Sequence, residues 1–98
     1  MSFRIDRVSV EGGVVLFGIG KLTGEHVDTL RNALRQESGA LAIDLKDVSL
    51  VDRDAVQLLA LAEYNGTELR NCPKYVQEWV KRERLEMRGK SPPGEQQR

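Results

Sequence analysis

The residues best suited to chemistry in this sequence are four closely spaced aspartates, Asp44, Asp47, Asp52 and Asp54. Converging carboxylates bind Mg²⁺ or Ca²⁺, but a Ca²⁺ loop has a defined spacing with an internal glycine. These four span a predicted strand end, a turn and a predicted helix start, and they do not form such a loop. Aspartate is also common in turns and at helix N-termini. We therefore interpret all four as turn or capping residues and predict no metal site.

The chain has one cysteine and one histidine. Cys72 lies near a predicted helix N-terminus, where a thiol pKa can be lowered. A nucleophile also needs a base and an oxyanion site, and His26 lies on a different predicted helix. We interpret Cys72 as a buried structural residue and His26 as a surface residue. The sequence therefore predicts no enzyme, no catalytic residue and no cofactor.

Composition sets further bounds. The 98 residues are 40% hydrophobic and 31% charged, with 15 basic and 15 acidic side chains. This composition is typical of one folded domain. Because the charges balance, no overall field favours nucleic acid or a lipid surface as a partner. No apolar run approaches the ~20 residues of a bilayer span, and the N-terminus lacks a signal-peptide pattern. We expect a cytoplasmic protein without direct membrane insertion.

The first part of the chain predicts two strands. Residues 3–10 alternate between apolar and polar, as a half-buried strand does. The phase slips between Ile5 and Val8, which indicates a bulge or a late strand start. Residues 11–13, Glu-Gly-Gly, form a tight-turn signal. Residues 14–19 run apolar without alternation, which predicts a central strand covered on both faces.

A helix is predicted next. Thr23 can cap it by accepting a hydrogen bond from a free backbone N–H. Its apolar face consists of Val27, Leu30, Ala33 and Leu34. Gly18 and Gly20, just ahead, are too few for a phosphate-binding loop and indicate a bend. Ser38-Gly39 is predicted to end the helix, with the glycine in the left-handed conformation.

The second part predicts a strand, a helix and a further strand. Leu41, Ile43 and Leu45 alternate with smaller residues, and residues 46–51 are predicted as a short loop. Asp52 is an N-cap candidate for an almost wholly apolar helix, which Asn65-Gly66 stops. Residues 67–71 are mostly polar, which is typical of a strand at a sheet edge.

Pro73 is predicted to open a final helix, because a missing N–H has no consequence at that position. Its predicted buried stripe consists of Tyr75, Val76, Trp79 and Val80. From Lys81 onward charged residues dominate, which favours a solvated helix extension over a nucleic-acid arm. Docking of a partner helix through Leu85 and Met87 remains an open alternative.

The predicted order is therefore β-β-α-β-α-β-α within one domain over residues 1–88, followed by a disordered tail over residues 89–98. The two strand–helix–strand units should be right-handed crossovers with parallel strands, whereas the hairpin pairs the first two strands antiparallel. We expect an α/β fold, namely a mixed four-stranded sheet with its helices mainly on one face.

Three stretches invite a family comparison. The first is Gly20-Lys21-Leu22-Thr23, the second runs from Ala42 to Asp52, and the third joins residues 66–69 to residues 72–76. With the element order, they make residues 3–80 resemble the STAS domain of anti-sigma-factor antagonists. The resemblance implies a module that acts by docking to anti-sigma-factor kinases or within transporter and signalling assemblies. Many members are switched by phosphorylation of a Ser or Thr directly after the helix-capping Asp.

This sequence departs from the family at the switch. Asp52 is followed by Arg53, Asp54 and Ala55, so the phosphoacceptor position holds an arginine and the motif's glycine is an alanine. Two interpretations stay open. Either residues 52–54 form a docking surface with permanent charges, or Asp52 caps, Asp54 complements the helix dipole and Arg53 is merely solvated. We favour capping for the aspartates and partner contact for Arg53, since arginine is enriched at interface hot spots.

The leading hypothesis is a non-catalytic regulatory protein–protein binding module that contacts its partner through Asp52, Arg53, Asp54 and Gln57. Gln57 follows Arg53 by one helical turn, so both side chains should project together. The expected partner is an anti-sigma-kinase-like regulator. The alternative is a cytoplasmic STAS subunit that holds the ATPase of a membrane ABC-transporter complex. A small enzyme or nucleotide binder would need a titratable pair that the sequence lacks, and a weak homodimer remains open.

Overall fold

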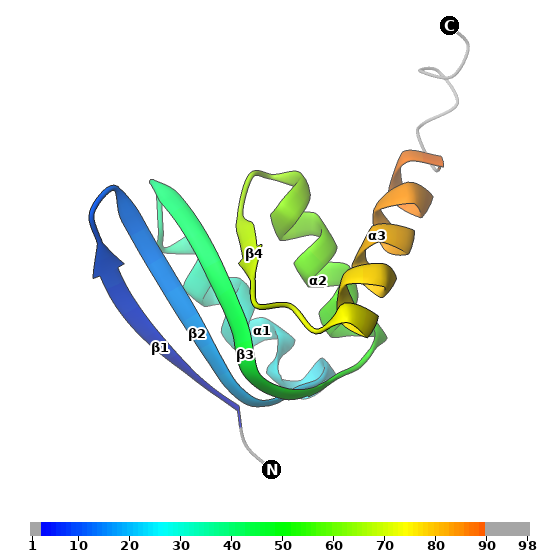
Figure 1. Ribbon diagram of the computed structural model, residues 1–98, viewed down its shortest axis with the longest axis horizontal. Helices are drawn as coiled ribbons and strands as arrows, with labels where there is room; N and C mark the ends of the chain where they lie inside the picture. The colour runs from blue at the N-terminus through cyan, green and yellow to red at the C-terminus, as the bar shows by residue number, and fades with distance from the viewer. Residues whose placement is uncertain (1–2, 90–98) are drawn as a thin grey trace, which may run out of the picture.

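A computed structural model describes residues 3–89 of the chain. The elements follow one another as predicted, and Figure 1 labels each of them. Their bounds are β1 Phe3–Val10, β2 Gly13–Leu22, α1 Gly24–Arg35, β3 Ala40–Val51, α2 Arg53–Tyr64, β4 Glu68–Arg70 and α3 Lys74–Gly89. The predicted tail, residues 89–98, lies outside the described residues except for Gly89.

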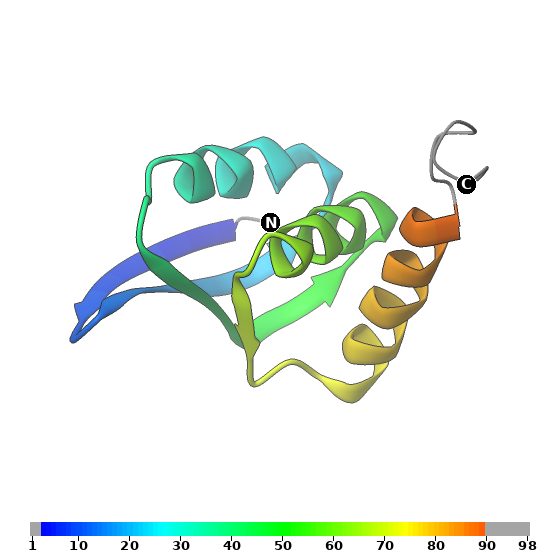
Figure 2. The same cartoon turned by 90° about the horizontal axis from the view of Figure 1, so that it is seen from above.

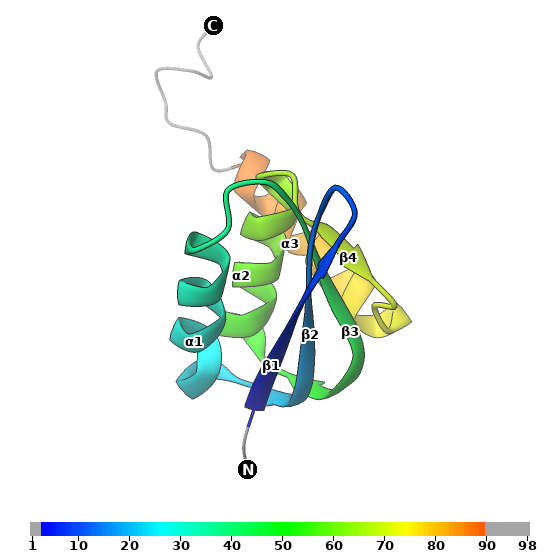
Figure 3. The same ribbon diagram turned by 90° about the vertical axis from the view of Figure 1, so that its left-hand side faces the viewer.

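The four strands form one mixed sheet in the order β1-β2-β3-β4. β1 pairs antiparallel to β2, whereas β2 with β3 and β3 with β4 are parallel. The short strand β4 lies at the edge of the sheet, as predicted. Figures 2 and 3 show the helices gathered on one side of this sheet, with α3 beyond β4 and beside α2. The predicted α/β class and topology are confirmed.

The core lies between the sheet and α2. This helix is largely apolar, and 6 of its 12 residues are buried. It packs against α1 and α3 as well as against the sheet, so an amphipathic stripe would not suffice. Its buried members are Ala55, Val56, Leu58, Leu59, Ala60 and Ala62. The helix ends as predicted, with Asn65 as its C-cap and Gly66 at φ +104°.

The predicted bulge in β1 is absent. β1 pairs residue for residue with β2 from Phe3 to Val10. Phe3 and Ile5 pack against the core, whereas Val8 and Val10 have the opposite parity and therefore lie on the other face of the sheet. The strand is regular, but its apolar residues switch from one face of the sheet to the other along its length. This switch explains the slip in the apolar pattern.

Within residues 14–19, Val15 and Leu16 point to opposite faces and are both buried, at 3% and 1% exposed. The expectation that the whole run is covered on both faces is wrong. Leu16 and Ile43 are neighbours on the face toward the helices, and each is 1% exposed. On the other face no helix of the described chain covers the sheet (Figure 2), and Phe17 and Ile19 are only half-buried. We call this other face the open face.

The predicted loop over residues 46–51 is also wrong, because β3 continues to Val51 and β2 to Leu22. Two register shifts interrupt their pairing, one between Phe17 and Ile19 and one between Gly20 and Lys21. Gly20 takes φ +105° at the second shift. These irregularities break the alternation in the sequence, so a paired segment looks like a loop.

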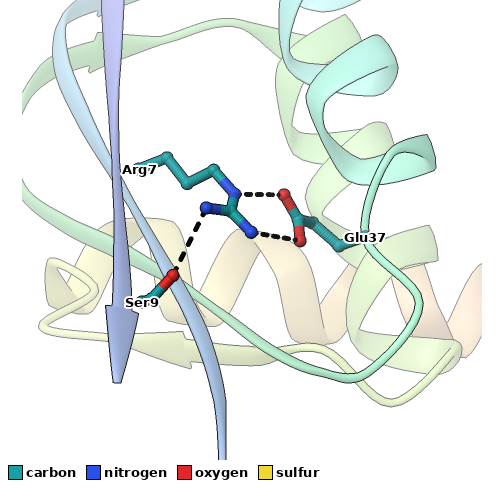
Figure 4. Close-up of polar contacts among 3 residues, drawn as sticks. All are labelled: Arg7, Ser9 and Glu37. Carbon is teal, nitrogen blue, oxygen red and sulfur yellow. Dashed lines mark hydrogen bonds and ion pairs between the residues drawn. The ribbon is translucent and has the colours of Figure 1, made fainter.

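The end of α1 differs from the prediction. The helix stops at Arg35 with Gln36 as its C-cap, and Gly39 does not take a left-handed φ. The chain beyond it is held by Glu37 instead. Its carboxylate accepts two hydrogen bonds from Arg7 of β1, from Nε at 2.6 Å and Nη2 at 3.2 Å (Figure 4). This contact lowers the pKa of Glu37, and it ties the α1–β3 connection to β1.

The last helix begins after Pro73, as predicted, and Gln77 N–H donates to the Pro73 carbonyl at 2.9 Å. Val76 and Val80 are buried, but Tyr75 is 53% exposed, so its assignment to the buried stripe is wrong. The stripe instead continues into Glu83, which is 7% exposed. Spacing explains this, because 76, 80 and 83 lie on one helix face.

Candidate functional site

One carboxylate joins the starts of α1 and α2. Asp52 Oδ1 accepts the N–H of Ala55 at 3.0 Å, which is the predicted N-cap of α2. Asp52 Oδ2 accepts the N–H of Gly24 at 2.7 Å, in the first turn of α1. Both bonds satisfy backbone donors that a helix leaves without an intrahelical partner. Asp52 therefore fixes the two helix N-termini against each other.

The predicted cap of α1 is wrong in its residue. Thr23 occupies the N-cap position with an extended backbone, but its side chain makes no capping hydrogen bond. Asp52 serves instead from a position distant in the sequence. Gly24 allows this, because a Cβ at that residue would lie 3.1 Å from Asp54 Oδ2 and 3.5 Å from Asp52 Oδ2. The two aspartates thus crowd the start of α1, where the helix dipole favours negative charge.

Arg53 and Gln57 differ from Asp52 in their exposure. Arg53, Asp54 and Gln57 are all exposed, whereas Asp52 is half-buried. Within residues 3–89, Arg53 makes no side-chain hydrogen bond or ion pair. Arg53 and Gln57 are separated by one turn of α2, so they lie on one helix face. We call Gly24, Asp52, Arg53, Asp54 and Gln57 the helix-start corner.

A shallow groove of ≈ 360 Å³ begins at this corner and runs between α1 and α2. Its apolar residues include Leu58 and Leu61, and Leu61 is 44% exposed. Its polar margin includes Asp54 and Gln57, with an ion pair between Asp28 and Arg31 on the α1 side. The groove is lined by Gly24, Val27, Asp28, Arg31, Asp54, Gln57, Leu58 and Leu61. It combines a partly exposed apolar floor with charge, as protein interfaces do.

The sequence analysis does not predict this groove. Its apolar residues belong to the pattern that predicts the core, and nothing in that pattern separates Leu61 from its buried neighbours in α2. The signal that remains is the pairing of Asp28 with Arg31 at i,i+3 on α1, which marks an exposed helix face.

The four aspartates do not converge. Asp44 accepts the N–H of Lys46 at 2.8 Å and the amide of Asn71 at 2.8 Å, which joins β3 to the segment after β4. Asp52 is engaged with the two helices, and Asp47 is exposed. In the part of the chain that the structure describes, no group of three His, Cys, Asp or Glu side chains is placed to hold a metal ion.

A larger cleft of ≈ 640 Å³ lies between β4, the end of α2 and α3. We call it the β4–α3 cleft. Its charged side chains include Glu63 and Arg84, which pair at 3.1 Å. Cys72 faces the cleft, where burial and then the charge of Glu63 raise its pKa to about 11. The thiol is therefore protonated near neutral pH, and a protonated thiol is a poor nucleophile. Its full lining is Glu63, Leu69, Asn71, Cys72, Gln77, Val80, Lys81, Arg84 and Leu85.

His26 is not the surface residue that we predicted. Its side chain is 20% exposed, and its ring lies 5.9 Å from the ring of Phe3. Its Nδ1 atom is buried and has no hydrogen-bond partner in the described residues. The neighbours of His26 in the sequence are mostly charged and polar, so they predict a surface position. The contact is with Phe3 of β1, which is distant in the sequence.

Neither a scan of protein-family models nor a search of curated proteins finds a match to this chain. Across residues 3–89, no helix has the length and apolar character needed to cross a membrane.

Proposed function

We propose that this protein is a non-catalytic regulatory module of the STAS type, which binds a partner protein through the helix-start corner. The observation that carries the proposal is that adjacent residues differ in whether they are already hydrogen-bonded. Asp52 is engaged by both helices, while Arg53, Asp54 and Gln57 remain exposed beside it. Asp52 holds the backbone of this corner in place, so little backbone entropy is lost when a partner binds.

The groove between α1 and α2 supports the same surface. An arginine at the start of α2 and an apolar groove beside it match the composition of interface centres, where arginine and apolar residues are enriched. The expected partner is a cytoplasmic regulator of the anti-sigma-kinase type, with an acidic side chain opposite Arg53. Since position 53 has no hydroxyl, phosphorylation there does not switch the contact.

The test is quantitative recovery of partners with the tagged protein. Wild type and Arg53→Glu are compared, and recovered proteins are identified by mass spectrometry. Reversal of one interface charge should reduce recovery of the partner at least tenfold, because an opposite-charge contact becomes a repulsive one.

The matched control is Arg82→Glu, since Arg82 is an exposed arginine on α3. This variant should recover the same proteins as wild type. Equal recovery of every protein by wild type and Arg53→Glu would contradict the proposal. Recovery of a transporter ATPase in place of a regulator would support the same docking surface but assign the partner to the alternative class.

A further inference from the structure

β1 is an unusually open edge of the sheet. Within residues 3–89 it is the first strand in the order β1-β2-β3-β4 and pairs only with β2, and Figure 1 shows no helix or strand of these residues beyond it. The strand is 8 residues long, whereas the opposite edge strand, β4, has 3. A long edge strand presents unpaired N–H and C=O groups, which form a template for pairing with another chain.

The outward-facing backbone groups follow from the hairpin. Its turn consists of Glu11 and Gly12, so Val10 and Gly13 close it, and a two-residue turn closes on a hydrogen-bonded pair. Residues of an antiparallel pair alternate between bonded and non-bonded positions. The odd-numbered residues of β1, among them Ile5 and Arg7, therefore turn their N–H and C=O groups away from β2.

We propose that two copies of this protein associate through antiparallel pairing of β1 with β1, centred on Ile5. In this arrangement Arg4 of each copy lies opposite Asp6 of the other. Both side chains belong to the open face and are 70% and 51% exposed. They pair with each other at 3.3 Å within one strand, and in the dimer the two pairs combine into a group of four alternating charges.

The charges select this register. Directly opposite residues on two antiparallel strands interact, and like charges there are destabilising. A two-fold pairing centred on Asp6 would set Asp6 against itself, and one centred on Arg7 would set Arg7 against itself. A pairing centred on Val8 would face Asp6 with Val10, without a charge partner. Among these registers, the one centred on Ile5 places opposite charges face to face.

The proposed dimer should be weak because its interface is small. The overlap covers Phe3 to Arg7, so it buries much less surface than the roughly 1,200–2,000 Å² of stable interfaces. Association therefore depends on protein concentration. The exposed charges at the edge also limit pairing to partners with the matching sequence, in the manner in which natural edge strands avoid indiscriminate association.

The experiment is sedimentation equilibrium over a wide range of protein concentration. The wild type should show a reversible monomer–dimer equilibrium. Arg4→Asp and Asp6→Arg should each weaken it at least tenfold, because each sets like charges opposite one another. An equimolar mixture of these two variants should dimerise again, since each Asp of one then faces an Arg of the other.

Two controls separate this contact from others. Arg70→Asp disrupts the corresponding Arg70–Glu68 pair on β4, 3.2 Å apart, and should leave the equilibrium unchanged. In the wild type, hydrogen exchange at the Ile5 and Arg7 amides should slow as concentration rises. A wild-type protein that stays monomeric at every concentration overturns the proposal. So does a dimer that tolerates both charge reversals but is lost in Val8→Ser, which would assign the contact to the open face.

Discussion

The two hollows beside α2 differ in what their charges do. In the β4–α3 cleft, Glu63 and Arg84 pair with each other, and the Cys72 thiol is held protonated. At the helix-start corner, Asp52 is engaged by backbone N–H groups, whereas Arg53 has no partner among residues 3–89. The smaller groove also holds an ion pair, between Asp28 and Arg31. The helix-start corner beside it leaves Arg53 exposed without a partner among the described residues, which is why we place the docking surface there.

The largest expected effect comes from Asp52, because this residue caps two helices. Asp52→Ala should lower the free energy of unfolding by about 2–3 kcal/mol, since each lost cap costs roughly 0.5–2 kcal/mol. Urea denaturation monitored by circular dichroism measures it. Asp54→Ala is the matched control and should cost under about 1 kcal/mol. Equal losses for the two variants would show that Asp52 does not serve both helices.

Asp44 provides the corresponding test near the cleft. Asp44→Ala removes the acceptor for Lys46 N–H and for the Asn71 amide. We expect a loss of about 1–3 kcal/mol, because two part-buried hydrogen bonds to a carboxylate are lost. Asn71 takes φ +52°, a conformation that this contact helps to hold. A loss as small as that of an exposed residue, measured by urea denaturation, would mean that solvent replaces Asp44.

Asp44 and Asp52 also show which parts of the structure can be predicted from the sequence. Both are predicted as turn or capping residues. Asp52 as the cap of α2 is confirmed, whereas Asp44 lies within β3 and not in a turn. The contact of Asp52 with Gly24 joins residues 28 positions apart, and no local pattern records such a distance. The same holds for Phe3 against His26. Propensity and periodicity describe neighbours along the chain, so contacts across the fold escape them.

The strands show the same limit in another form. The order of elements and the edge position of β4 follow from turn signals and apolar runs, and the structure confirms them. The extent of β3 was underestimated because register shifts in its pairing with β2 disturb the alternation. The apolar run in β2 suggested cover on both faces. Helices cover one face, and apolar residues such as Val8 and Val10 stay 43% and 45% exposed.

The ion pair in the β4–α3 cleft should matter less than either aspartate. Arg84→Ala removes the pair with Glu63 and a contact with the Tyr64 ring, whose centroid lies 5.8 Å away. Because both charged side chains are more than a third exposed, the expected loss is only about 0.5–1 kcal/mol. Thermal unfolding of Arg84→Ala and of the exposed control Arg82→Ala measures the difference. Identical unfolding temperatures would show that the cleft charges contribute nothing to stability.

The thiol in the cleft gives a pH-dependent prediction. Burial raises the Cys72 pKa from 9.0 to about 11, so alkylation at pH 8 should be much slower than in the unfolded chain. The folded protein keeps its proton while the unfolded chain releases it. The free energy of unfolding should therefore fall as the pH rises from 9.0 to about 11. Cys72→Ser should remove this part of the pH dependence. Rapid alkylation of the folded protein would contradict it.

The smallest expected change in stability is at Arg53. Arg53→Glu alters an exposed side chain without an intramolecular partner in residues 3–89, so the free energy of unfolding should change by less than about 0.5 kcal/mol. Urea denaturation measures it. A large loss would mean that Arg53 belongs to the structure and would remove the contrast between the two regions.

Site-specific photo-crosslinking in living cells tests the docking surface most directly. A photoreactive amino acid replaces Gln57 at the helix-start corner or Tyr75 on α3, both of which are exposed. We predict a discrete crosslinked partner from position 57, lost when Arg53→Glu is added, and none of that mass from position 75. The same product from position 75, or no product from position 57, would contradict the assignment of the corner as the docking site.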